Sequence, residues 1–178
     1  MVKDGLFEQD YALKKVFIDL VEKDGLRSLS VVELVKKASI SRSTFYSHYS
    51  GIYGVFESIA SEIASRLCGI YDKFEFREYK KALIEICYFV KNNQRVFKIL
   101  LTKTGSEFSY LMINLFKKKI NLNEFINQMN TGDSLSSYFL TFIINGSLGV
   151  FTEWIVRGCQ DDPQFIIDTF IATIKATI

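Results

Sequence analysis

A cluster of polar side chains that could hydrogen-bond nucleic acid lies between residues 41 and 48. Arginine, serine, threonine, tyrosine and histidine side chains surround a single phenylalanine there, Phe45. Such groups can contact base edges and phosphates when a helix enters the major groove of DNA. The window from Leu34 to Phe56 contains no aspartate or glutamate, whereas acidic residues are frequent elsewhere. Because DNA phosphates repel acidic groups, this pattern favours DNA binding.

Two short helices joined by a three-residue turn are predicted to position these side chains. Ser30 and Glu33 have the spacing of a capping box, which begins a helix that ends near Ala38. Residues 39–41 form the turn, and its last serine is a natural N-cap for a helix over residues 42–49. This arrangement is a helix-turn-helix, a motif that also occurs in proteins that never contact DNA. The sequence pattern alone leaves that alternative open.

A supporting helix is predicted before them, from Asp10 to Asp24, with Gly25 ending it. Its apolar face consists of Leu13, Val16, Phe17, Leu20 and Val21. Its polar face consists of Lys14, Lys15, Asp19, Glu22 and Lys23.

The rest of the chain repeats the helical spacing of apolar residues, contains a single proline and shows no strand-like alternation. Further helices are predicted at about 51–71, 76–91, 93–101, 106–119, 123–129, 135–158 and 163–176, with a break at residues 131–134. Asp162 followed by Pro163 suits the start of the last one. The predicted fold is all-α, with a three-helix DNA-binding domain over residues 1–50 and further helices over residues 51–178.

Composition excludes several classes of protein. A net charge of +2 excludes a uniformly basic nucleic-acid coating protein. Cys68, Cys87 and Cys159 are widely spaced, and the chain has one histidine, so we expect reduced structural thiols and no metal site. No phosphate loop or Cys/His pairing supports an enzyme, and no cofactor is expected. The apolar run Tyr138–Phe151 is 14 residues long, against the ~20 that span a bilayer, and the N-terminus has no signal-peptide core. These features predict a cytoplasmic protein with no membrane segment.

About residues 9 to 60 resemble the N-terminal domain of TetR-family transcriptional regulators, most specifically in Thr44-Phe45-Tyr46 followed by His48-Tyr49. The resemblance implies a helical regulatory and dimerisation domain over residues 51–178. Three later segments, 93–101, 145–151 and 154–158, are similar to a subgroup that includes regulators of dihydroxyacetone kinase operons.

The resemblance implies a set of DNA-contacting residues: Ser30, Ser41, Arg42, Ser43, Thr44, Tyr46, Ser47 and His48. Ser30 would touch phosphate, and the side chains of residues 42–44 would lie near base edges. Tyr46 and His48 would lie against the DNA backbone, and Ser47 could serve either role.

Two departures from the family pattern matter. The family usually has glycine where this chain has Ser39, and a small polar cap followed by lysine where it has Gly51-Ile52. The family lysine commonly holds a phosphate. Its replacement by Ile52 predicts weaker DNA binding. It also predicts a lower salt dependence, because one lost phosphate contact lowers the slope of log affinity against log salt concentration by roughly 0.9. A changed operator, or DNA binding that needs a helper, would also fit.

The resemblance also implies a homodimer in which the last two helices pair across a two-fold axis. The predicted interface consists of Phe139, Phe142, Gly146, Gly149, Ile167, Phe170, Ile171 and Ile174. Packing of these residues within one chain is the alternative. A two-fold dimer would place its recognition helices roughly 34–36 Å apart and so require a palindromic operator on double-stranded DNA.

Aromatic residues of the middle helices are candidates for an effector pocket: Phe89, Phe97, Phe108, Tyr110, Phe116 and Trp154. They would suit a small apolar or aromatic effector, although aromatic residues at helical spacing also form ordinary cores. The sequence therefore predicts a ligand-responsive repressor that acts as a homodimer. The alternative is a regulator or coactivator controlled by a protein partner.

Overall fold

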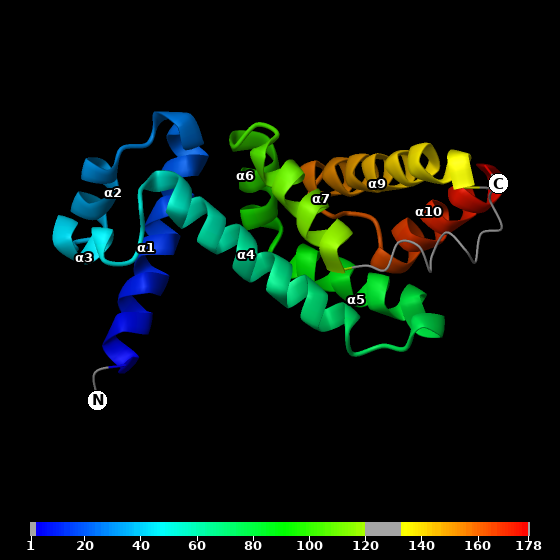
Figure 1. Cartoon of the computed structure of the whole chain (residues 1–178), viewed down its shortest axis with the longest axis horizontal. Coiled ribbons are helices and arrows are strands. Elements are labelled where there is room, and N and C mark those ends of the chain that lie inside the picture. Colours follow the sequence, from blue (N-terminus) through cyan, green and yellow to red (C-terminus); the bar gives the residue numbers. More distant parts are fainter. Residues whose placement is uncertain (1–2, 120–132, 178) are drawn as a thin grey trace. The chain divides into compact units, whose positions relative to one another are not determined.

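The computed structural model describes residues 3–119 and 133–177, which form helices joined by turns and loops and contain no strand (Figure 1). The first elements are α1 (Lys3–Asp24), the 3-10 turn η1 (Leu26–Ser28), α2 (Val31–Lys37), α3 (Arg42–Tyr46) and α4 (Ile52–Tyr71). They are followed by the 3-10 turn η2 (Phe76–Glu78), α5 (Tyr79–Asn92), α6 (Gln94–Lys103), α7 (Glu107–Lys119), α9 (Asp133–Val156) and α10 (Pro163–Thr177). The predicted all-α class is confirmed.

Helix starts lie where the capping residues predict them. Ser30 Oγ accepts the Glu33 N–H at 3.2 Å, and Ser41 Oγ accepts the Thr44 N–H at 3.0 Å. At the start of α10, Asp162 Oδ1 accepts the Gln164 N–H at 2.8 Å. Each side chain replaces a partner that the first turn of a helix lacks, which is why these positions begin helices.

Some predicted bounds were wrong. The helix expected over residues 42–49 ends at Tyr46, with Ser47 as its C-cap. The helix expected from Phe76 begins three residues later, after a 3-10 turn. The break expected over residues 131–134 is helical at its last two positions, where α9 starts. The helix predicted over residues 123–129 lies outside the described residues.

Two compact units make up the chain. The first contains residues up to Ile63 together with Ile99–Phe108. Its core is built on the apolar face predicted for α1, whose residues Phe17 and Val21 are completely buried. Leu34 from α2 and Phe45 from α3 are also buried, at 0% and 1% exposure. The first part of α4 clusters with this unit, beyond the boundary predicted after residue 50.

The second unit contains residues 64–98 and those after Phe108. Within it α5 packs against α10, and an ion pair of 2.6 Å between Lys80 and Asp168 joins the two helices. Trp154, near the end of α9, is 2% exposed, and its indole Nε1 donates to the Asp161 carbonyl at 3.1 Å. Buried polar groups need such partners, so this bond helps fix the end of α9.

The three cysteines are free, and Cys87 and Cys159 are buried. Burial, together with the neighbouring Cys159, raises the pKa of the Cys87 thiol to about 12. A thiol of that kind is a poor nucleophile, which fits the expected structural role. Among the described residues no cluster of ligating side chains could hold a metal ion. None of the described helices is long and apolar enough to cross a membrane.

Candidate nucleic-acid interface

The predicted recognition helix, α3, is five residues long and is anchored by one aromatic side chain. Phe45 is 1% exposed and lies edge-on to Tyr46, with ring centroids 5.3 Å apart. Its ring also lies 5.7 Å from that of Tyr49, just after the helix. Since a helix turns by about 100° per residue, Ser43 and Ser47 lie opposite Phe45 and are exposed. The helix therefore has one buried side and one side open to a ligand as large as DNA.

Three of the hydroxyl groups predicted to bind DNA also hold the helix itself. Ser41 Oγ lies 2.8 Å from Thr44 Oγ1, in addition to capping the Thr44 N–H. Ser47 Oγ donates to the Thr44 carbonyl at 2.7 Å. Thr44 is half-buried, whereas Arg42 and His48 are exposed. The side chains best placed for new contacts are therefore those of Arg42, Ser43, Tyr46 and His48.

The start of α2 carries the predicted phosphate contact. Ser30 is exposed while its oxygen caps the helix, so a second hydrogen bond from its hydroxyl can point outward. The Glu33 carboxylate forms an ion pair of 3.4 Å with Lys37. This pair offsets part of the positive charge at the end of α2.

The turn between α2 and α3 ends α2 with a pair of backbone hydrogen bonds. The Ile40 N–H donates to the Val35 carbonyl at 3.1 Å, and the Ser39 N–H donates to the Lys36 carbonyl at 3.4 Å. This is the Schellman pattern, which needs a left-handed residue just after the helix. Ser39 holds that position with φ of +55°. The serine that replaces the family glycine therefore lies in a backbone conformation that favours glycine.

The first turn of α4 contains the other departure from the family pattern. Ile52 is half-buried, and the adjacent Tyr53 is 49% exposed with its ring edge-on to Phe56 at 6.5 Å. This turn thus presents apolar and aromatic groups where the family commonly has a cation.

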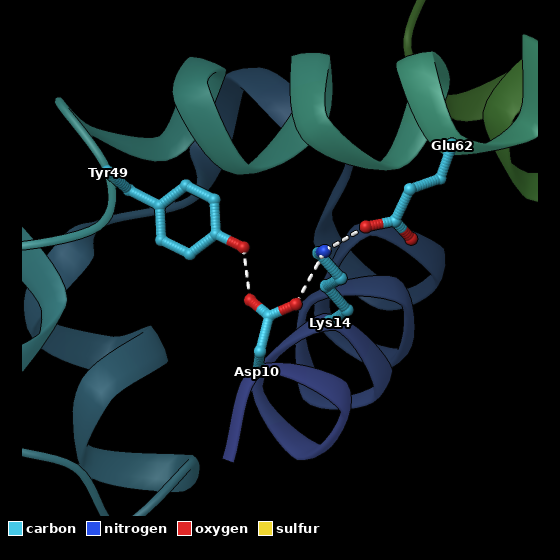
Figure 2. Close-up of polar contacts among 4 residues, drawn as sticks. All are labelled: Asp10, Lys14, Tyr49 and Glu62. Atoms are coloured by element: carbon cyan, nitrogen blue, oxygen red, sulfur yellow. Dashed lines mark hydrogen bonds and ion pairs between the residues drawn. The ribbon is translucent and has the colours of Figure 1, made fainter. Parts of the chain in front are cut away.

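A polar cluster that the sequence analysis missed joins α1, the segment after α3, and α4 (Figure 2). Lys14 Nζ lies 2.6 Å from Asp10 Oδ2 and also forms an ion pair with Glu62. The Tyr49 hydroxyl donates to the other oxygen of Asp10. Lys14 was assigned to the polar face of α1, but its side chain is only 12% exposed. The available signal was the i,i+4 spacing of Asp10 and Lys14, which places opposite charges side by side on a helix.

Partial burial and pairing act in opposite directions on this cluster. Burial alone would raise the pKa of Asp10, but the hydrogen bonds from Lys14 and Tyr49 outweigh it, and the pKa is lowered. Burial alone would lower the pKa of Lys14, but its two carboxylate partners raise it. Burial and the bond to Asp10 raise the pKa of Tyr49, against a smaller effect of Ser58. The charged pair and the neutral phenol are therefore the stable forms near neutral pH.

The residues predicted for the dimer interface fall into distinct environments. Phe142 is 53% exposed, and Gly146 and Gly149 are exposed with open space at the position of a side chain. Ile167 is completely buried in its own chain, and Phe170 and Ile171 are half-buried. The side chains of Phe139 and Ile174 lie outside the described residues. The exposed members all belong to α9.

The predicted pocket residues are also divided. Phe97 and Trp154 are buried in the second unit, where the half-buried Phe89 meets Phe97 edge-on at 6.0 Å. Phe108 is buried in the first unit, and Tyr110 is 69% exposed. The side chain of Phe116 lies outside the described residues.

Comparison with known proteins identifies relatives of this arrangement. Residues 77–176 match a TetR-type family model described as "Transcriptional regulator C-terminal region". Among solved structures, a TetR transcriptional regulator from Streptococcus agalactiae 2603V superposes with a TM-score of 0.78 at 18% identity, covering 98% of each chain. No curated protein sequence matches the chain.

Two further structures are similar over nearly their whole length. The fatty acid degradation regulator FadR from Bacillus halodurans has a TM-score of 0.68 at 15% identity, covering 93% of this chain and 94% of its own. The dihydroxyacetone kinase operon activator DhaS has a TM-score of 0.64 at 17% identity, covering 96% of each chain. At these identities the likeness concerns the fold.

Proposed function

This chain belongs to the TetR family of transcriptional regulators, and we propose that it is a sequence-specific repressor that binds a palindromic operator as a homodimer. The observation that carries the proposal is the outward side of α3. Arg42, Ser43, Tyr46 and His48 are exposed around a buried Phe45, in a window free of acidic residues. Arginine at the start of a recognition helix suits bidentate contact with guanine, and the exposed hydroxyls suit phosphates or base edges.

Dimerisation would use α9 and the open side of α10. Phe142 and Val150 are 53% and 40% exposed on α9, and Gly146 and Gly149 between them leave room for a second helix backbone. A contiguous exposed apolar surface of this kind commonly marks a protein interface. The cytoplasm is the compartment in which such a regulator would meet its operator.

Effector control would use the second unit, where Phe89, Phe97 and Trp154 supply apolar aromatic surface. A small apolar or aromatic molecule that binds one conformation of the protein better than the other would shift the population that fits the operator. The identity of that molecule is open.

A second candidate is an activator or coactivator whose control comes from a protein partner. Two observations favour it: the similarity to DhaS, an operon activator, and the missing cation at Ile52, which weakens the expected hold on DNA. Thermal shift assays against a metabolite library separate the candidates. An effector at about 100 times its dissociation constant adds about 2.7 kcal/mol of stability, whereas the partner-controlled protein shows no shift.

Operator binding is tested with duplexes selected from a random DNA pool. We expect Arg42→Ala to weaken binding of the selected operator about ten- to hundredfold, since a base contact by arginine contributes about 1–3 kcal/mol. Arg77→Ala removes the same charge from the exposed η2 turn and is the matched control. Failure to select any sequence, or equal affinities of the two variants, would contradict the proposal.

A further inference from the structure

We infer that the cluster of Asp10, Lys14, Tyr49 and Glu62 is a positioning device that sets the orientation of the recognition helix without touching DNA. The inference rests on the proposed DNA-binding function and adds residues that the recognition motif does not include. Figure 2 shows the four side chains converging from α1, α4 and the segment after α3.

The connectivity of the cluster gives it this role. Tyr49 follows the C-cap of α3 by two residues, and its backbone N–H donates to the Phe45 carbonyl at 2.9 Å. Its hydroxyl reaches Asp10, 39 residues earlier in the chain. Lys14 then joins Asp10 to Glu62, 48 residues after the lysine. The end of the recognition helix is thus joined to α1, and α1 is joined to α4, through these side-chain contacts.

The cation of the cluster is more enclosed than that of an ordinary surface ion pair, whereas its partners Asp10 and Glu62 are 37% and 56% exposed. The Lys14 side chain is 12% exposed, and its ammonium group lies between two carboxylates. A charge in such a place is strongly destabilising when one partner is removed, so the geometry is held. Asp10 uses one oxygen for Lys14 and the other for Tyr49, so the two contacts depend on a single carboxylate.

The consequence for DNA binding follows from the shortness of α3. A helix of five residues cannot hold its own conformation in water, so its direction depends on the buried Phe45 and on contacts at its ends. Loss of the Tyr49 hydroxyl bond would leave the Phe45–Tyr49 ring contact and widen the range of helix orientations. Only the fraction of molecules with the correct orientation binds operator, and the apparent affinity falls in proportion.

The test uses Tyr49→Phe, Asp10→Ala and the double variant in the full chain, with affinity for the selected operator measured at several salt concentrations. We expect each single variant to weaken binding about tenfold and the double variant to lose little more, since both changes remove the same bond. The slope of affinity against salt should stay that of the wild type, because no phosphate contact is lost. Tyr88→Phe removes a hydroxyl from α5 in the second unit and should change nothing.

Several outcomes would overturn the inference. They are unchanged affinity of Tyr49→Phe, fully additive losses in the double variant, or a salt slope reduced by about one unit, which would mean direct contact with phosphate. If Tyr49→Phe fails to fold, Glu62→Gln tests the same cluster at its exposed end, where the carboxylate side chain is 56% exposed. A wild-type protein that binds no DNA would refute the proposed function. If the wild type binds the operator and the variants bind it with the same affinity, only this inference is refuted.

Discussion

Replacement of Ser39 by glycine should stabilise the protein, because this residue holds a left-handed conformation in the turn of the helix-turn-helix. Its φ is +55°, and two backbone hydrogen bonds fix the turn around it. A residue with a Cβ atom loses about 1–2 kcal/mol in that conformation, and glycine loses almost nothing. Glycine also gives the unfolded chain more freedom, which returns about 0.5–1 kcal/mol. The net expectation for Ser39→Gly is a gain of about 1 kcal/mol.

That gain is large enough to measure by thermal unfolding. An unfolding entropy of about 2.1 cal/mol/K per residue gives about 0.37 kcal/mol/K for the 178 residues. A gain of about 1 kcal/mol then raises Tm by about 3 °C at a fixed protein concentration. In urea the midpoint should rise with an unchanged slope, since the folded and unfolded surfaces stay the same.

The preceding residue supplies a matched control. Ala38 is the C-cap of α2 with φ of −79°, a right-handed conformation that alanine adopts without strain. Ala38→Gly should therefore lower stability by about 0.5–1 kcal/mol, the usual effect of extra backbone freedom. Operator affinity of Ser39→Gly should match the wild type, because the turn keeps its shape. A lower Tm for Ser39→Gly, or the same shift in both variants, would refute the reasoning.

Three other expectations follow from burial and charge. Asp10 has a lowered pKa in the folded state, so its stabilising effect is present above its unfolded pKa of about 3.9 and disappears as the pH falls through the folded value. Wild-type Tm should fall more steeply than that of Asp10→Asn between pH 5 and 3, and parallel curves would contradict this. Phe142→Glu, at a 53% exposed position on α9, should sediment as a monomer at micromolar protein concentration. Tyr88→Glu, at a 48% exposed position on α5, should remain a dimer. A monomeric wild type would rule out the dimer. Phe45→Ala should lower the free energy of unfolding in urea by about 3–5 kcal/mol, because the Phe45 side chain is 1% exposed. A similar loss for Tyr46→Ala, whose side chain is 58% exposed, would be inconsistent with this.

Capping residues in the sequence predicted the starts of α2, α3 and α10 well. A serine or aspartate at an N-cap acts on a backbone N–H two or three residues away, so the information is contained within one turn. Ser30, Ser41 and Asp162 all make these bonds. The end of α3 was harder to predict because Ser47, Tyr49 and their neighbours are compatible with helix. The chain leaves the helix there, and Tyr49 reaches Asp10.

Contacts between distant residues account for most of what the sequence could not reveal. Lys14 has the spacing of a polar-face residue, and its pairing with Glu62, 48 residues later, is a contact that this spacing does not reveal. Ile167 was assigned to a dimer interface on its apolar character, and it is completely buried in its own chain. Apolar periodicity shows that a helix face is covered, but it does not show which partner covers it.

The side chains of α3 that are proposed to contact DNA differ from those that hold the helix in place, and this explains why supporting contacts lie outside the recognition motif. Side chains that are to meet DNA must be exposed, so they cannot also hold the helix in the core. Within α3 only Phe45 is buried, and the neighbouring sequence from Leu34 to Phe56 contains no acidic residue. The orientation of α3 must then come from Phe45 and from contacts at the ends of the helix. The Ser41 cap fixes the start, and the bond from Tyr49 to Asp10 fixes the segment that follows the end. The acids of the cluster, Asp10 and Glu62, belong to α1 and α4, and Lys14 pairs with both of them, so the cluster supports this region without placing an acidic residue in α3.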